Sequence, residues 1–206
     1  MVRLLIATEN QGKKREYQQL LASLPWVLCT PRDLALTLAI DENGDSYAQN
    51  ARIKALRYMQ ASQLPALADD SGLEVDALGG APGFHSARYA SGTANDADRY
   101  HLLLQNLAAL PWEKRTARFR CVLVLAVTGG QVYTTEGTCE GIIAFEPAGN
   151  HGFGYDPIFY LAEQGQTMAQ LPAEVKNRIS HRARAVQQMI PILSHILAET
   201  PAGGGY

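Results

Sequence analysis

The chain has 206 residues, which is enough for one large domain that buries its own core without a disulfide or a structural metal. Apolar residues make up 47% of the sequence and charged residues 18%, the composition of an ordinary soluble globular protein. The formal net charge of −2 argues against a non-specific nucleic-acid binder, which is normally strongly basic. Any anion that the protein binds must therefore be met by a local cluster of cations.

The three cysteines, Cys29, Cys121 and Cys139, form no CxxC pair and are odd in number. This pattern favours free thiols in a reducing cytoplasm over a disulfide framework. The apolar stretch at the start is too short for a signal peptide or a membrane anchor, and we interpret it as a buried strand. We expect a cytoplasmic protein that is not associated with a membrane.

Apolar runs alternate with helical patterns, which is typical of a layered α/β fold. The predicted elements, in chain order, are strand 3–8, helix 10–24, strand 26–30, helix 46–62, strand 65–69, extended segment 73–78, helix 95–109, strands 118–128 and 131–145, and a final helix 172–198. Ser46 is the expected N-cap of the second helix. Gly129-Gly130 predicts a hairpin between the two long strands.

These elements predict an α/β fold with a twisted mixed sheet that is flanked by helices, in which the long hairpin forms part of a second lobe. Residues 1–200 are expected to form a single domain of two lobes, and the tail 201–206 is expected to be disordered. A cleft between lobes is the usual place for a ligand.

The first candidate site is the segment 8–14, Thr-Glu-Asn-Gln-Gly-Lys-Lys, where a strand turns into a helix. Backbone N–H groups at a helix N-terminus attract anions, and helical spacing places Lys13 on the face that Asn10 begins. The segment lacks the first glycine and the Ser or Thr of a Walker A loop. A phosphate cradle and a simple helix cap with solvated lysines both remain open.

Two acidic segments are candidates for a metal site. Asp69 and Asp70 follow an apolar run, where carboxylates need a cation, and Mg²⁺ prefers such oxygen ligands. One of these carboxylates could also accept a proton from an attacking water. The alternative is a surface turn, because Asp, Ser and Gly are common in turns. The second segment is the acidic loop 41–44, which precedes a helix on which Asn50 and Lys54 share a face.

Two further segments are candidates for base recognition. The loop 152–157 places glycines around Phe153 and Tyr155, whose rings could stack on a base or pack into the core. In the segment 176–182, helical spacing would put Lys176 and Ser180 on one face and Asn177 and His181 on another. This segment could equally be a solvated basic stretch. The sequence contains no HExxH, GxSxG or GxGxxG motif, so zinc hydrolase, serine hydrolase and Rossmann functions lack support.

The order of these segments resembles the inosine triphosphate pyrophosphatase family, also described as XTP/dITP diphosphatases. The blocks that carry the resemblance are T-x-N-x-x-K (8–13), ENGDSYAQNARIKA (42–55), ADDSGLEVDALGGAPG (68–83), SARY (86–89), FGYDP (153–157) and KNRISHRARA (176–185). Together they span almost the whole chain.

The resemblance implies an elongated α/β fold with a central cleft, a homodimer, and Mg²⁺-dependent hydrolysis of ITP, dITP and XTP to the monophosphate and pyrophosphate. Asp70, Lys13 and Lys54 would be the catalytic residues. The resemblance implies that substrate is bound by Thr8, Glu9, Asn10, Gln11, Gly12, Lys13 and Ser71 at the phosphates, and by Phe153, Gly154, Tyr155, Asp156, Lys176, His181 and Arg182 at the base.

One departure concerns the metal ligands. The family's Glu-Glu-Thr-Gly is replaced by Asp41-Glu42-Asn43-Gly44, which aligns the metal-linked glutamate with Asp41. Either Asp41 or Glu42 could then join Asp70. Three other functions stay open: a less selective nucleotide pyrophosphatase, a catalytically silent nucleotide-binding protein and, against the net charge, a nucleic-acid binder.

Overall fold

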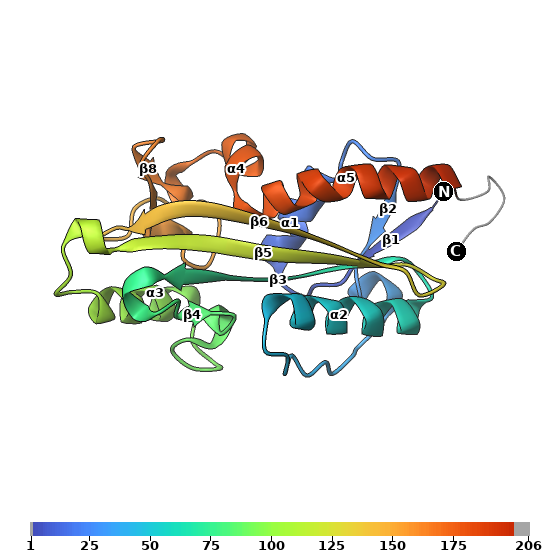
Figure 1. Cartoon of the computed structure of the whole chain (residues 1–206), viewed down its shortest axis with the longest axis horizontal. Helices are drawn as coiled ribbons and strands as arrows, with labels where there is room; N and C mark the ends of the chain where they lie inside the picture. Colours follow the sequence, from blue (N-terminus) through green and yellow to red (C-terminus); the bar gives the residue numbers. More distant parts are fainter. Residues whose placement is uncertain (1, 200–206) are drawn as a thin grey trace. The chain divides into compact units, whose positions relative to one another are not determined.

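The structure, a computed structural model, describes residues 2–199 (Figure 1), so the tail predicted to be disordered lies outside the described residues. The chain divides into two compact units. The first contains the described residues up to Asp70, then Cys121–Gly137 and the residues from Arg182 onward; the second contains Ser71–Arg120 and Thr138–His181. No helix within residues 2–199 is long and apolar enough to cross a membrane.

The strands form one mixed sheet, in the order β2-β1-β3-β5-β6-β7-β8 with β4 paired to β3. Their bounds are β1 (Arg3–Ile6), β2 (Val27–Cys29), β3 (Ala66–Val75), β4 (Pro82–Gly83), β5 (Thr116–Ala126), β6 (Val132–Ile143), β7 (Phe159–Leu161) and β8 (Gln166–Thr167). The pairs of β1 with β2 and β3 are parallel, while β3–β4, β6–β7 and β7–β8 are antiparallel. The predicted mixed α/β fold is confirmed.

The helices are α1 (Gln11–Leu20), α2 (Tyr47–Ser62), α3 (Asp96–Asn106), α4 (Ala173–Ile179) and α5 (His181–Glu199). In the first unit, α5 and α2 lie on opposite sides of the strands (Figure 1). The core on the α5 side combines apolar residues of β1, β3 and β5 with Tyr17 of α1, with Leu21 at the C-cap of α1, and with Val186 and Met189 of α5. Ser46 caps α2 as predicted, because its hydroxyl accepts the amide of Gln49.

The long hairpin of β5 and β6 is also present, with Gly129 and Gly130 both at positive φ in its turn. The second unit has its own core, in which Leu73 and Val75 of β3, Phe119 of β5 and Phe159 of β7 are buried with residues of α3. The short strands β4, β7 and β8 were not predicted, because two or three residues carry too little periodicity to be recognised.

Two predictions were wrong in ways that matter for the site. β3 does not stop at Asp70 but continues through Ser71 and Gly72 to Val75, which excludes the surface-turn interpretation of the paired aspartates. The final helix is interrupted at Ser180, which has extended backbone angles (φ −66°, ψ 157°) between α4 and α5. The shared helical faces expected for Lys176 with Ser180 and for Asn177 with His181 therefore do not exist.

A buried arginine ties the second unit together. The Arg115 side chain is 1% exposed and donates hydrogen bonds to the carbonyls of Ile143, Leu107 and Ala144, at 2.7, 2.7 and 2.8 Å. These bonds join the start of β5 to the end of β6 and the end of α3. A buried guanidinium is costly unless its donors are satisfied, so the three carbonyls and the arginine depend on one another.

We expect Arg115→Met to lower the free energy of unfolding by about 3 kcal/mol, because the three buried carbonyls would lose their donor. Arg118→Met, three residues further along the chain, is the control, since the ion pairs of Arg118 with Asp76 and Glu140 are solvent-accessible and should contribute less than about 1 kcal/mol. Urea denaturation measures both changes. Equal losses in the two variants would contradict the role of Arg115.

Candidate active site

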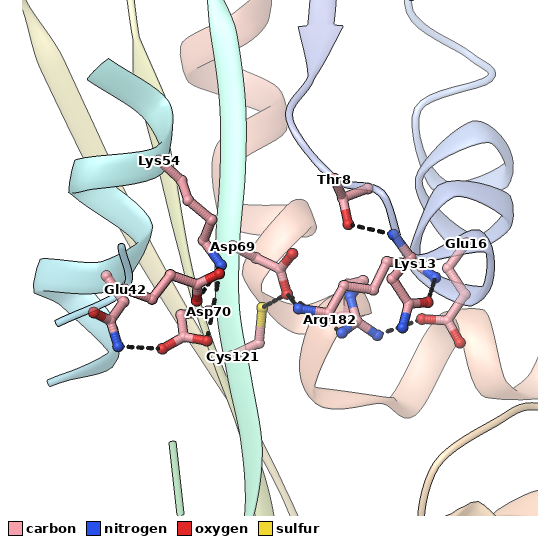
Figure 2. A network of polar contacts seen from close by, with 11 residues as sticks. Thr8, Lys13, Glu16, Glu42, Lys54, Asp69, Asp70, Cys121 and Arg182 are labelled. Atoms are coloured by element: carbon pink, nitrogen blue, oxygen red, sulfur yellow. Dashed lines mark hydrogen bonds and ion pairs between the residues drawn. The ribbon is translucent and has the colours of Figure 1, made fainter. Parts of the chain in front are cut away.

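The centre of the site in the first unit is the pair of neighbouring aspartates on β3. Because successive side chains of a strand point to opposite faces, Asp69 and Asp70 leave the strand in opposite directions (Figure 2). Both are buried, at 2% and 6% exposure. Each carboxylate meets a lysine from a different helix, Lys13 of α1 for Asp69 and Lys54 of α2 for Asp70.

Asp69 is the acceptor at the centre of a buried ionic network. Its Oδ2 lies 2.9 Å from Lys13 Nζ and 3.4 Å from Arg182 Nη2, and Arg182 also donates to Glu16. Burial alone would raise the pKa of Asp69, but attraction to Lys13, Arg182 and Lys54 outweighs it and holds that pKa far below its usual range. Asp69 is therefore ionised at neutral pH and anchors the cations around it.

Asp70 has a different environment. Its Oδ2 accepts a hydrogen bond of 3.1 Å from Asn50 Nδ2, and its Oδ1 lies 3.9 Å from Lys54 Nζ. Burial raises the pKa of Asp70, and the attraction of Lys54 and the hydrogen bond from Asn50 offset only part of that rise. A carboxylate with a raised pKa is suited to accept and release a proton.

Asn50 and Lys54 link Asp70 to the acidic loop before α2. Lys54 Nζ lies 3.0 Å from Glu42 Oε2, and the Asn50 side-chain oxygen accepts the amide of Gly44 at 2.9 Å. A Cβ on Gly44 would lie 2.7 Å from Gln49 Cβ, so the close approach of this loop to the helix depends on glycine. The structure thus places Glu42, rather than the exposed Asp41, beside the lysine that Asp70 contacts.

The segment 8–13 forms the N-terminus of α1. Asn10 is the N-cap, and its side chain accepts the amide of Lys13 at 3.0 Å, while its own amide donates to Thr8 Oγ1 at 3.2 Å. Glu9 and Gln11 are exposed and Gly12 is buried. The strand-to-helix turn therefore presents Lys13 and the first amides of a helix together, as an anion-binding segment requires.

The carboxylates of this unit fit a metal ion that is held jointly by protein and substrate better than one that is coordinated by protein side chains alone. Among residues 2–199, no three His, Cys, Asp or Glu side chains gather as metal ligands. Glu42 and Asp70 nevertheless meet at one lysine, and burial has raised the pKa of Asp70, so a nearby cation would favour its ionised form. Mg²⁺ is commonly held by one or two carboxylates together with substrate phosphates, which agrees with this donor set.

In the second unit, Asp156 organises the loop predicted to recognise a base. Asp156 is 3% exposed, and its Oδ2 accepts the amide of Phe153 at 3.0 Å and a hydrogen bond from Lys176. The Lys176 ammonium lies 5.0 Å from the centre of the Phe153 ring. A Cβ on Gly152, which has φ +76°, would meet Asp156 Oδ2 at 2.0 Å, so glycine is required there by both conformation and space.

The other residues predicted to recognise the base differ in their surroundings. Tyr155 is buried in the core of the second unit and donates its hydroxyl to the Ser86 carbonyl at 2.9 Å, so of the two rings only the half-buried Phe153 offers a face. Burial raises the pKa of the Tyr155 hydroxyl, which stays neutral. His181 stacks on Phe119, with ring centres 4.8 Å apart and planes inclined by 16°.

Arg182 differs from the expectation most clearly, because it is 1% exposed and lies with Glu16 and Asp69 in the first unit. Sequence reasoning did not single out Glu16 and gave Asp69 no partner. The signals were present: Glu16 follows Lys13 at helical spacing, and alternation along a strand separates Asp69 from Asp70. Ser71, expected beside the phosphates, is half-buried on β3 in the second unit.

The two aspartates should have opposite effects on stability. Asp69→Asn would remove the counter-charge of Lys13 and weaken the charge balance around the buried Arg182, which keeps its pairing with Glu16, so we expect a loss of about 3 kcal/mol at pH 7. Because folding lowers the pKa of Asp69, this stabilisation is present above the ordinary aspartate value of 3.8 and is lost as the pH falls below it.

Folding raises the pKa of Asp70, so its ionisation costs stability as the pH rises from 3.8 through the folded-state value. Asp70→Asn should therefore be at least as stable as the unmodified protein at pH 7. Urea denaturation of both variants at pH 7 and pH 3.5 tests the pair. A similar loss for Asp69→Asn and Asp70→Asn at pH 7 would show that the two environments do not differ.

Comparisons with known proteins agree over almost the whole sequence. A protein from Geobacter sulfurreducens named dITP/XTP pyrophosphatase is 47% identical over 186 residues, covering 90% of this chain and 94% of that protein. A HAM1 protein structure from Coxiella burnetii has a TM-score of 0.85 at 40% identity, covering 95% of this chain and 100% of that one.

A structure from Mycobacterium abscessus, described as nucleoside-triphosphatase / dITP/XTP pyrophosphatase, has a TM-score of 0.73 at 39% identity and covers 92% of this chain and 100% of its own. The Ham1 family matches residues 4–192. These matches confirm the family resemblance inferred from the sequence motifs. This chain belongs to the Ham1 family.

Proposed function

We propose that this protein is a nucleoside triphosphate pyrophosphatase that hydrolyses the α–β phosphoanhydride bond of ITP, dITP and XTP, releasing the monophosphate and pyrophosphate and so removing deaminated purines from the nucleotide pool. The observation that carries the proposal is the pair of buried aspartates on β3, each facing one lysine. Relatives at 42–47% identity that are named dITP/XTP pyrophosphatase support the reaction class.

In the proposed mechanism the first unit performs the chemistry. Asp70 accepts a proton from the water that attacks the α-phosphorus, and the hydrogen bond from Asn50 orients its carboxylate. Lys13 and the amides at the start of α1 hold the phosphates, and Lys54 neutralises charge on the departing pyrophosphate. Asp69 keeps Lys13 in place through their 2.9 Å ion pair.

The residues that would hold Mg²⁺ are Asp70 and Glu42, with substrate phosphate oxygens completing its coordination. When bound, the ion would offset the negative charge that the phosphates bring to this site. Asp41 is a weaker candidate because its side chain is exposed and Glu42 already contacts Lys54.

We assign base recognition to the loop that contains Phe153 and Asp156 and to Lys176 and His181. Hypoxanthine and xanthine carry a 6-oxo acceptor where adenine carries an amino donor. A buried donor such as Lys176 or His181, each at most 6% exposed, would be opposed by adenine, and such mismatches cost orders of magnitude in affinity. Arg182 would contribute to substrate binding indirectly, through its ion pair with Asp69 in the first unit.

We further propose that the protein is a cytoplasmic homodimer. The dimer rests on the family resemblance alone. The location is supported by the three cysteines, which are buried free thiols, as expected in a reducing compartment.

Pyrophosphate release from ITP and ATP at equal concentration, with Mg²⁺ or with EDTA, tests the reaction and the base selectivity. We expect rapid release from ITP with Mg²⁺, little from ATP, and none with EDTA, because the donor set needs a cation to accept the phosphates. Equal rates on ITP and ATP would support the less selective pyrophosphatase. No release from either would favour a silent nucleotide-binding protein.

Asp70→Asn should lower kcat for ITP by about 100-fold or more, because general-base catalysis contributes that much. Asp45→Asn, in the loop before α2, is the matched control: it makes the same chemical change at an exposed side chain and should leave kcat within about twofold. Steady-state pyrophosphate release and circular dichroism measure activity and folding. Unchanged turnover of Asp70→Asn would exclude Asp70 from the chemistry.

A further inference from the structure

An acidic residue of the second unit, remote in sequence from the loop 152–156, contacts that loop directly. The Asp96 carboxylate, in the first turn of α3, accepts a hydrogen bond of 2.7 Å from the backbone amide of Gly154, which lies 58 residues further along the chain. The sequence motifs did not point to Asp96. Its other oxygen accepts a hydrogen bond of 2.8 Å from Arg99 Nη1, one helical turn away.

This contact is separate from the capping of α3. The helix is capped by Asn95 and Asp98, whose side chains accept each other's backbone amides in a capping box. The Asp96 side chain is 46% exposed and has no place in that box. Its two oxygens instead connect Arg99 on one side and Gly154 on the other, so this carboxylate joins the helix to the loop.

Gly154 is the residue of the loop whose backbone this contact restrains. Its neighbours have contacts of their own, since Phe153 donates its amide to Asp156 and Tyr155 donates its hydroxyl to Ser86. Gly154 itself has φ +64°, a left-handed conformation, and an added Cβ would meet nothing within 4 Å. Glycine is therefore required by conformation rather than by space, and the hydrogen bond from its amide selects one backbone conformation of a permissive residue.

Phe153 precedes Gly154 directly, so the hydrogen bond from the Gly154 amide restrains the backbone on the C-terminal side of the Phe153 ring, as the bond to Asp156 does on its N-terminal side. The Phe153 ring is half-buried and faces the Lys176 ammonium at 5.0 Å. The Phe153 carbonyl and the Gly154 amide share one peptide plane, so fixing that amide also limits the backbone freedom of Phe153. A ring that must stack on a purine binds more tightly if it is ordered before the ligand arrives, because binding then loses less conformational entropy.

We propose that Asp96 is a positioning residue for substrate recognition: it fixes the Gly154 amide and thereby presents the Phe153 ring to the purine base. The inference rests on the proposed function for the identity of the substrate, but the anchoring of Gly154 can be measured without any substrate.

The test compares Asp96→Ala and Asp96→Asn with Asp98→Ala in the full-length chain. Asp98→Ala is the matched control, since it removes an acidic group from the same helical turn and weakens the cap without touching the loop. We expect hydrogen exchange of the Gly154 amide, followed by NMR, to accelerate about tenfold or more in Asp96→Ala only, because a charge-assisted hydrogen bond is lost. Asn can still accept from the amide, so Asp96→Asn should restore part of the protection.

In pyrophosphate-release assays, KM for ITP should rise about tenfold in Asp96→Ala, with kcat within about twofold, and KM should stay unchanged in Asp98→Ala. Unchanged exchange at Gly154 in Asp96→Ala would overturn the anchor. Faster exchange with an unchanged KM, or a parallel fall of kcat in both alanine variants, would overturn the role in recognition. A native protein that releases no pyrophosphate would refute the proposed function, while the exchange result would still decide on the anchor.

Discussion

The site depends on one constraint: two neighbouring carboxylates, Asp69 and Asp70, are buried on β3. Burying a charge is costly unless it is paired, and the alternation of a strand sends the two side chains to opposite faces. One face must therefore supply a partner for Asp69 and the other a partner for Asp70. α1 and α2 meet this requirement with Lys13 and Lys54, so the need to neutralise β3 fixes where both lysines lie.

The Asp69–Lys13 and Asp70–Lys54 pairs are not equivalent, because the two carboxylates have different surroundings. Asp69 meets two cations, Lys13 and Arg182, and its pKa is held far below the usual range. Asp70 meets one lysine at 3.9 Å and a neutral amide, which leaves its pKa raised by burial. An aspartate that is always ionised makes a good anchor and a poor base, whereas its neighbour has the opposite properties. Adjacent residues of the same type thus acquire opposite pKa shifts from their surroundings alone.

Much of this was predictable from local sequence, and the failures have physical causes. The hairpin at Gly129-Gly130, the cap at Ser46 and the mixed sheet followed from turn chemistry and periodicity. The continuation of β3 past Asp70 did not, because Asp, Ser and Gly disfavour strands and the lysines that neutralise the two carboxylates come from helices remote in sequence. The break at Ser180 was equally hidden, because no proline or glycine marks it and a single extended residue is decided by tertiary packing.

Contacts between residues that are remote in sequence could not be predicted from motifs. The family resemblance assigned Arg182 to a base pocket, and the structure shows it buried against Glu16 and Asp69 of the first unit. Asp96 shows the same limitation, since its contact with Gly154 spans 58 residues. In both cases a charged group completes the hydrogen bonding of a segment remote in sequence. The motifs therefore identify the candidate site residues, whereas the residues that hold those groups in place are determined by the fold.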